Sequence, residues 1–244
     1  MKQRAINEKF GKISLIEAEH PETWENKIFL TFDIDWAHDE IIKDTIALVE
    51  QANVPATWFV THDTPLLKAL RANSKFELGI HPNFNFLLNG DPCKGANAEE
   101  VVDRLLEIVP EAKAVRCHSM TQSSEILQLF RDKELTHDCN HFMPEHAGFD
   151  LKPWYLWNGL IKVPYFWEDD LSFIYKQKFN ILELVKRNGV KVFDFHPIHV
   201  FLNTENLDRY EQTRPLHHNS YELIKHQYKG QGTRTYLVKL LKFV

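Results

Sequence analysis

The sequence predicts an α/β domain in which six or seven parallel strands form a closed or nearly closed barrel. Short apolar runs typical of β-strands alternate along the chain with segments whose apolar residues recur at helical spacing. Ionisable residues follow almost every one of these runs, at the strand end where (β/α) barrels place their chemistry. The 244 residues suit one large α/β domain or two small ones, and no linker, repeat or low-complexity tract divides them.

Seven apolar runs are the expected strands. They cover residues 27–33, 56–62, 76–81, 113–118, 135–140, 160–166 and 190–196. The expected helices lie between and after these runs, and the last segment is either a helix or an edge strand. They cover residues 38–53, 65–73, 123–133, 180–189, 219–232 and 235–244. We expect residues 1–26 to form an N-terminal extension and residues 27–244 to form the barrel domain.

Composition excludes several classes of protein. The 29 basic and 34 acidic side chains give a net charge of −5, so a nucleic-acid backbone or an anionic membrane is not an expected partner. The three cysteines are odd in number and lack C-x-x-C spacing, which indicates reduced thiols. No apolar stretch is long enough for a membrane span, and the first twenty residues do not read as a secretory signal. These features predict a cytoplasmic location.

Two aspartates at the end of the first strand are the sharpest feature of the sequence. Asp33 and Asp35 are two residues apart, so on a strand both carboxylates point to the same side. Two close carboxylates repel unless a cation lies between them, and a divalent metal would leave one carboxylate free as a base. The alternative is that Asp35 only caps the following helix.

A histidine and an asparagine follow the third strand. His81 precedes Pro82, and a helical turn after that proline would place Asn85 on the same face as His81. A histidine, an amide oxygen and Asp35 would leave one open position on a zinc-like ion. The alternative is an ordinary loop histidine beside a turn-forming asparagine.

Two further pairs repeat the spacing of two residues. Arg116 and His118 follow the fourth strand, and a fixed cation beside Asp33 would hold that carboxylate ionised, although an ordinary surface ion pair is an equal alternative for Arg116 alone. Asp194 and His196 end the last strand, where a carboxylate near an imidazole suits a general acid. The alternative for this pair is a buried structural bond.

The motifs resemble those of the polysaccharide deacetylases, the NodB-homology group or carbohydrate esterase family 4. The match is carried by TFDID, HPNFN, VRCHS and FDFHPIH, with further similarity at WFVTHDTP, and it spans roughly residues 27–200. It is closest to a divergent subgroup associated with O-antigen and surface-polysaccharide biosynthesis. The resemblance implies a single-domain distorted (β/α) barrel of about seven strands that uses a divalent metal to remove acetyl groups from N-acetylated sugars.

Carried over by position, the resemblance implies a role for each motif residue. Asp33 would be the catalytic base, oriented by Arg116, and His196 would be the general acid. Asp35 and His81 would bind the metal, and Asn85 stands at the second metal histidine of the family. We expect His118, Asp194 and Trp167 to bind substrate or to support the site.

The expected cofactor is zinc, with cobalt, manganese, nickel or iron as alternatives. The expected substrate is an N-acetylated sugar, nucleotide-linked or lipid-linked, and the sequence does not indicate an oligomeric state. Two other functions stay open. One is hydrolysis of small cyclic imides or ureides on the same barrel, and the other is non-catalytic carbohydrate binding.

Overall fold

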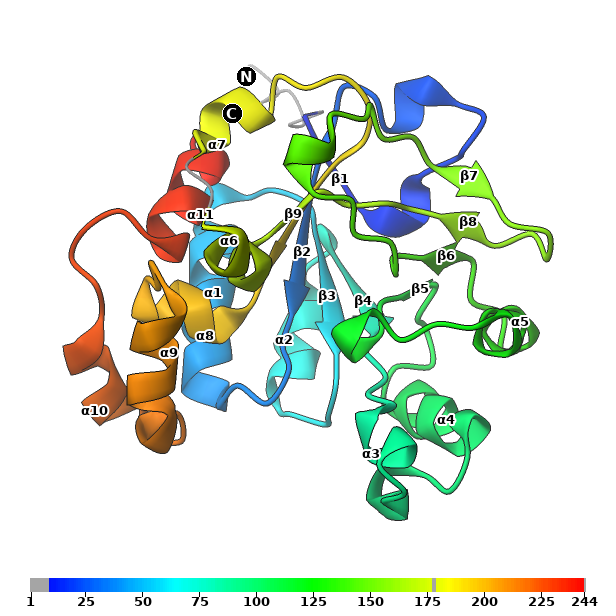
Figure 1. Ribbon diagram of the computed structural model, residues 1–244, viewed down its shortest axis with the longest axis horizontal. Helices are drawn as coiled ribbons and strands as arrows, with labels where there is room; N and C mark the ends of the chain where they lie inside the picture. The colour runs from blue at the N-terminus through cyan, green and yellow to red at the C-terminus, as the bar shows by residue number, and fades with distance from the viewer. Residues whose placement is uncertain (1–8, 177–178, 244) are drawn as a thin grey trace.

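The computed structural model describes residues 9–176 and 179–243, and its centre is one curled sheet (Figure 1). The strand order is β7-β8-β6-β5-β4-β3-β2-β10-β9, and β1 pairs with β2 outside this path. All pairings are parallel except that between β7 and β8. The strands are β1 (Phe10–Gly11), β2 (Ile28–Asp33), β3 (Ala56–Val60), β4 (Phe76–Ile80), β5 (Ala114–Val115), β6 (His137–Asp138), β7 (Trp154–Tyr155), β8 (Ile161–Lys162), β9 (Trp167–Glu168) and β10 (Lys191–Phe195).

The helices pack around the outside of the sheet and at its carboxyl end (Figure 1). They are α1 (Asp39–Ala52), α2 (Leu66–Ala72), α3 (Asn85–Leu88), α4 (Ala98–Ile108), α5 (Ser124–Asp132), α6 (Asp169–Tyr175), α7 (Ile181–Leu184), α8 (Pro197–Leu202), α9 (Leu207–Thr213), α10 (Ser220–Leu223) and α11 (Thr233–Leu241). No helix of the described residues is both long and apolar enough to cross a bilayer.

The prediction of a mainly parallel, barrel-like α/β fold is confirmed. The sheet is a half-barrel, because β7 and β9 form its two free edges and do not pair with each other. Each of the seven expected runs contributes strand residues, although β5, β6 and β8 keep only two each. The last expected segment is the helix α11 and not an edge strand.

Besides β7, β9, α6, α8 and α9, two further parts of the fold were not expected. The helix α4 begins after Asn97, whose side chain accepts a hydrogen bond from the backbone N–H of Glu100, and it buries Val101, Val102 and Leu105. The segment expected as an N-terminal extension also joins the sheet, because β1 pairs with β2. The first eight residues lie outside the described part of the chain.

Strand register brings the site residues together at one edge. Asp194 pairs with Thr31 across β10 and β2, Asp33 pairs with Phe59 across β2 and β3, and Ile80 pairs with Val115 across β4 and β5. The strands are parallel, so the residues that follow them emerge side by side. Beneath this edge the ring of Phe32 stacks on Trp58 at a centroid distance of 4.3 Å, which makes the floor of the site a packed aromatic core.

Candidate active site

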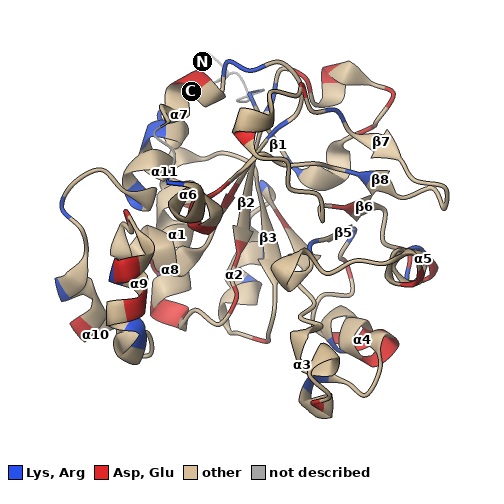
Figure 2. Ribbon diagram, in the orientation of Figure 1, with Lys and Arg blue, Asp and Glu red and all other residues tan. Residues whose placement is uncertain are grey.

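A cavity of about 410 Å³ opens at the carboxyl end of the sheet. The ends of β2, β4, β5 and β10 form its floor, and the helix α9 contributes Leu207 and Tyr210 to one wall. Figure 2 shows acidic ribbon segments gathered on β2 and beneath α6, near the centre of the molecule. Asp33, Asp35, His81, Arg116, His118 and His196 all line this cavity.

Arg116 holds Asp33 from below. Its Nη1 donates a hydrogen bond to Asp33 Oδ1 at 3.1 Å and also contacts Asp194 Oδ1. The guanidinium is buried between the rings of Phe59 and Tyr165, whose centroids lie 4.7 and 4.6 Å from Cζ. Stacking on both faces fixes the direction in which the guanidinium points. The geometry therefore agrees with the expected orientation of Asp33 by Arg116.

Asp194 belongs to this network and does not hydrogen-bond to His196. Its Oδ1 accepts a hydrogen bond from the hydroxyl of Thr31 at 2.7 Å. Burial raises the pKa of Asp194 to about 8, because the opposing effect of Arg116 does not cancel the cost of burying the carboxylate. A protonated Asp194 is neutral, so it does not compete with Asp33 for the positive charge of Arg116.

Asp35 lies just beyond the end of β2, in a turn where its backbone φ is +42°. Its Oδ1 lies 3.3 Å from Nε2 of His81 and 3.3 Å from Nδ1 of His118. His81 follows β4, and its other ring nitrogen lies 3.4 Å from Asp33 Oδ2. Asp35 caps no helix, because α1 begins after His38. The capping alternative for Asp35 is therefore wrong.

The carboxylates and imidazoles of this group shift one another's pKa values. Burial raises the pKa of Asp35, but the imidazoles of His118 and His81 outweigh burial and hold that pKa far below its usual range. Burial lowers the pKa of His81, but Asp33 and Asp35 outweigh burial and raise it above 6.5. Both shifts favour an ionised carboxylate facing nitrogen donors.

The polar atoms of this group fit a divalent cation. Asp35 Oδ1 and both ring nitrogens of His81 are buried and have no hydrogen-bond partner, although they lie 3.3–3.4 Å from polar neighbours. One ligand atom each from Asp35, His81 and His118 lie within 4.8 Å of one another. Two imidazoles and a carboxylate are a ligand set that zinc accepts, with a fourth position left open.

Other carboxylate and imidazole groups near the cavity fit a cation less well. The group of Asp33, Asp194 and His196 has the guanidinium of Arg116 against both of its carboxylates. The groups that contain Asp169 or Asp170 depend on His196, whose Nδ1 already has a carboxylate partner. A buried cation beside Arg116 would be repelled, so Asp35, His81 and His118 remain the best-fitting set.

His196 follows β10 and faces the opposite side of Asp35. Its Nε2 lies 3.5 Å from Asp35 Oδ2, and its Nδ1 lies 2.7 Å from Asp169 Oδ1. Asp169 Oδ2 also accepts the backbone N–H of His196 at 2.9 Å. The carboxylate that fixes this imidazole is thus Asp169, and the expected pairing with Asp194 is wrong. The reason is that Asp194 Oδ1 already pairs with the hydroxyl of Thr31 and the guanidinium of Arg116, whereas Asp169 lies against the Nδ1 of His196.

Acidic neighbours keep His196 protonated. Burial lowers the pKa of His196, but Asp169, Asp170 and Asp35 together raise it well above 6.5. Close by, burial and the charge of Asp170 raise the pKa of Glu168 well above its usual value, and Glu168 Oε2 accepts a hydrogen bond from the hydroxyl of Tyr165 at 2.9 Å. Glu168 and Asp170 also line the cavity, so this acidic run is part of the candidate site.

The other two expected site residues lie away from the cavity. Asn85 begins α3, where its amide Nδ2 donates to Ser119 Oγ at 3.1 Å, and it does not line the cavity beside Asp35 and His81. Its role as a metal ligand stays a prediction. Trp167 is buried in β9, with its ring centroid 4.8 Å from that of Phe195, so it packs under the site and does not reach its surface.

Sequence reasoning did not assign Asp169, Tyr165 or α9 to the site. For Asp169 and Tyr165 the available signal was their proximity to the end of the 160–166 strand, which does not choose among three consecutive acidic residues. No sequence signal placed α9 at the cavity wall, because its position depends on how the chain returns after α8.

At its carboxyl end the parallel half-barrel carries a carboxylate held by an arginine, an imidazole held by a carboxylate, and a set of side chains that could bind a metal. This combination is typical of barrel hydrolases. The comparison with protein families gives the particular family. The chain belongs to the WbmS-like polysaccharide deacetylase family, whose model matches residues 30–214.

One solved structure agrees with this assignment, and two more distant ones are also similar. The chain is 47% identical to WbmS from Bordetella bronchiseptica, described as a polysaccharide deacetylase involved in O-antigen biosynthesis; the match covers 96% of this chain and 98% of that one, with a TM-score of 0.91. A family 4 carbohydrate esterase from Streptomyces lividans, in complex with acetate, is 10% identical over 88% and 87% of the two chains, with a TM-score of 0.47. A polysaccharide deacetylase from Mycobacterium smegmatis is 17% identical over 70% and 77%, with a TM-score of 0.48. No match was found among curated proteins.

Proposed function

We propose that this protein is a metal-dependent hydrolase that removes the acetyl group from an N-acetylated sugar in O-antigen biosynthesis. Its family and its 47% identity to WbmS support the reaction class and the biosynthetic setting. The observation that carries the proposal is the placement of Asp35, His81 and His118 between Asp33 on one side and His196 on the other.

Asp35, His81 and His118 would hold the metal. We assign zinc, because imidazole and carboxylate donors with an open position suit it, and cobalt, manganese, nickel and iron remain the alternatives to test. When bound there, the metal supplies a Lewis acid that polarises the acetyl carbonyl and lowers the pKa of water.

The side chains of the protein then move two protons. Asp33, oriented by its hydrogen bond from Arg116, takes a proton from the attacking water as the new carbon–oxygen bond forms. His196 donates a proton from Nε2 to the sugar nitrogen as the carbon–nitrogen bond breaks, which releases acetate and a free amine. Asp169 accepts the Nδ1–H of His196, so that Nε2 faces the reacting group.

The test combines metal analysis with acetate release. We expect protein purified without chelator to hold about one metal per chain and to release acetate from N-acetylated nucleotide sugars. Asp33→Asn and His196→Gln should each lower this rate about 10²–10⁴-fold, because each removes one proton-transfer step. His118→Ala should lose bound metal, while Asn85→Ala should keep it.

Matched controls are Asp150→Asn and His226→Gln, which change exposed residues outside the cavity. Full turnover in Asp33→Asn or His196→Gln would overturn the assigned roles. Metal loss in Asn85→Ala but not in His118→Ala would restore Asn85 as the third ligand. Sugar binding without acetate release from any substrate, whatever metal is added, would identify a non-catalytic member of the family.

A further inference from the structure

A second cavity, of about 360 Å³, lies next to the first and shares Asp35, Trp36 and His81 with it. The rest of its lining comes from the end of β3 and from the segment between β4 and β5, which includes α3 and α4. In Figure 1 this segment lies on the opposite side of the carboxyl end of β2 from α9. A substrate bound at the metal site therefore has a direct route into this cavity past Trp36.

The second cavity contains two positive charges without acidic partners. Lys94 and Arg104 line it, and neither lies within 4.0 Å of a carboxylate of any described residue. The Nε of Arg104 is buried and makes no hydrogen bond. Lys94 Nζ lies 5.8 Å from the ring centroid of Phe86. Asp91 Oδ1 accepts the backbone N–H of Cys93, and among the described residues the Asp91 carboxylate forms no ion pair with Lys94 or Arg104. A buried guanidinium nitrogen without a partner indicates a missing acceptor.

One neutral donor group faces this cavity beside the two cations. Asn83 Oδ1 accepts the backbone N–H of Asn85 at 2.9 Å, which leaves its amide NH₂ free. The hydroxyl of Thr61 donates to the carbonyl of Asp35, so His62 donates from Nδ1 to Thr61 Oγ1 at 2.7 Å, and the Nε2 of the neutral ring is an acceptor. The carboxylate in the lining is Asp35, which already faces the imidazoles of the metal site. The two cations and the free amide of Asn83 therefore favour a ligand that carries negative charge and acceptor oxygens.

We propose that the second cavity binds the diphosphate group of the substrate, so that the N-acetylated sugar is carried as a diphosphate ester. Two uncompensated cations match the two negative charges of a diphosphate diester, whereas a sugar carboxylate would need one. The faces of Trp36 and Phe86 offer apolar surface beside the charges. This inference rests on the proposed function, because it places the acetylated sugar in the first cavity.

The experiment measures the binding of inorganic pyrophosphate and of UDP to the metal-loaded protein by titration calorimetry. We expect the double variant Lys94→Gln/Arg104→Gln to weaken both dissociation constants at least about 10-fold relative to wild type, because each lost charge removes a charge-assisted contact. Coordination of either probe to the metal is common to wild type and variant, so the difference reports on the second cavity alone.

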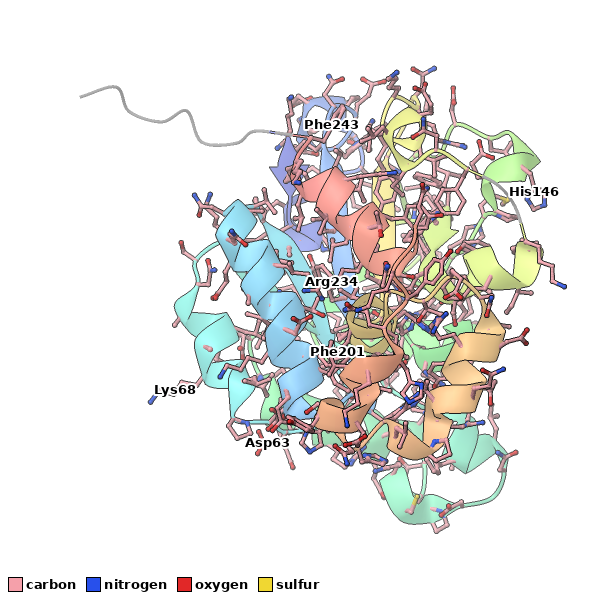
Figure 3. The ribbon with its side chains drawn as sticks, turned by 90° about the vertical axis from the view of Figure 1, so that its left-hand side faces the viewer. Asp63, Lys68, His146, Phe201, Arg234 and Phe243 are labelled. Carbon is pink, nitrogen blue, oxygen red and sulfur yellow. The ribbon has the colours of Figure 1, made fainter. Side chains whose placement is uncertain are left out.

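The charge-matched control is Lys68→Gln/Arg131→Gln. Both residues are exposed, and Figure 3 shows Lys68 projecting from α2 into solvent. UDP binding about 10-fold tighter than pyrophosphate would identify a nucleotide-linked sugar, and equal affinities would identify recognition of the diphosphate alone, as expected for a lipid-linked sugar. Equal affinities of wild type and Lys94→Gln/Arg104→Gln for both probes, or no binding of either, would overturn the inference.

The two proposals fail in different ways. Acetate release from a free N-acetylated sugar, with pyrophosphate affinity unchanged in Lys94→Gln/Arg104→Gln, would remove the diphosphate site and keep the deacetylase. Charge-dependent pyrophosphate binding without acetate release from any substrate would keep the diphosphate site and remove the deacetylase.

Discussion

At the scale of single residues, the sequence predicts the direction of side chains on a strand but not of those in the turns that follow it. Strand alternation predicted that Asp33, Arg116 and His196 converge, and the structure brings them to one cavity. Beyond a strand, the backbone turn directs the side chain. The φ of Asp35 is +42° and that of Ser119 is +57°, conformations that strand alternation does not anticipate. The position of His118 beside Asp35 depends on such turns, whereas the pairing of His196 with Asp169 depends on where α6 begins after β9.

The first prediction concerns Asp169, which positions His196. Asp169→Asn removes the charge that holds the Nδ1–H of His196, so Nε2 is no longer reliably presented as a donor. We expect kcat for acetate release to fall about 10²-fold with little change in KM, because the interaction matters in proton transfer and not in sugar binding. Steady-state kinetics over a range of substrate concentrations measure this split.

A purely structural role for Asp169 would give a different result. It would lower the thermal unfolding midpoint and leave kcat per folded molecule unchanged. Asp170→Asn is the neighbouring comparison, because Asp170 lines the same cavity but does not contact the Nδ1 of His196. A smaller loss of kcat in Asp169→Asn than in Asp170→Asn would contradict the assignment.

At the scale of elements, the longer strands and most of the longer helices were predicted, and short elements were not; the helix α4, with 11 residues, is the exception among the longer helices. The strands β2, β3, β4 and β10 each have five or six residues, and apolar runs located them. The strands β7 and β9 have two residues each and carry no pattern of their own. Their pairing is decided by neighbours far away in the chain, which a local sequence pattern does not describe.

Asn203, at the end of α8, provides the second prediction. Its φ is +51°, and its amide Nδ2 donates to the carbonyls of Tyr228 and Gly230 at 2.9 Å each. Its Oδ1 accepts both the backbone N–H and the hydroxyl of Thr235 at 3.1 Å. These bonds join α8, which begins just after His196, to the N-terminus of α11.

We expect Asn203→Ala to lower the free energy of unfolding by about 2–4 kcal/mol, because buried hydrogen-bonding groups lose their partner and alanine disfavours the left-handed backbone. Chemical denaturation measures this loss. Asn203→Gly keeps the backbone conformation and should lose less, while Asn206→Ala, which removes an N-cap of α9, should lose about 1 kcal/mol. A loss in Asn203→Ala no larger than that in Asn206→Ala would show that the junction between α8 and α11 contributes little.

At the scale of the whole molecule, the site exists only when the entire sheet has formed. Its residues follow strands that range along the chain from β2 to β10, and parallel pairing between these distant segments brings them together. The first and last described segments also lie in contact, because Lys9 Nζ lies 3.4 Å from the carbonyl oxygen of Phe243. In Figure 3, Arg234 lies where α11 approaches α1, and it forms an ion pair with Asp44. Conditions that unfold the protein should therefore abolish metal binding and activity together.

We expect low pH to destabilise the folded protein, and His217 provides the third prediction. Burial and the nearby His199 lower the pKa of His217 to about 4, and its Nε2 lies 3.3 Å from the hydroxyl of Thr213. The folded-state pKa is thus below the unfolded value of about 6.5, so the unfolded chain binds more protons between these pH values. The stabilising contribution of neutral His217 is complete above pH 6.5 and is lost as the pH falls toward 4.

The expected size of this contribution follows from the pKa shift. One pKa unit corresponds to about 1.4 kcal/mol, so the full shift from about 6.5 to about 4 sets an upper bound of about 3.4 kcal/mol. Screening by solvent should reduce it to about 1–2 kcal/mol. In His217→Gln, which cannot gain a proton, the free energy of unfolding should fall less between pH 7 and pH 4.5 than in wild type. Urea unfolding at several pH values measures both slopes.

The control is His226→Gln at an exposed position, which should follow wild type. Parallel slopes in wild type and His217→Gln would mean that His217 titrates alike in the folded and unfolded chain, and acid sensitivity would then come from other buried histidines, such as His137, whose pKa burial also lowers.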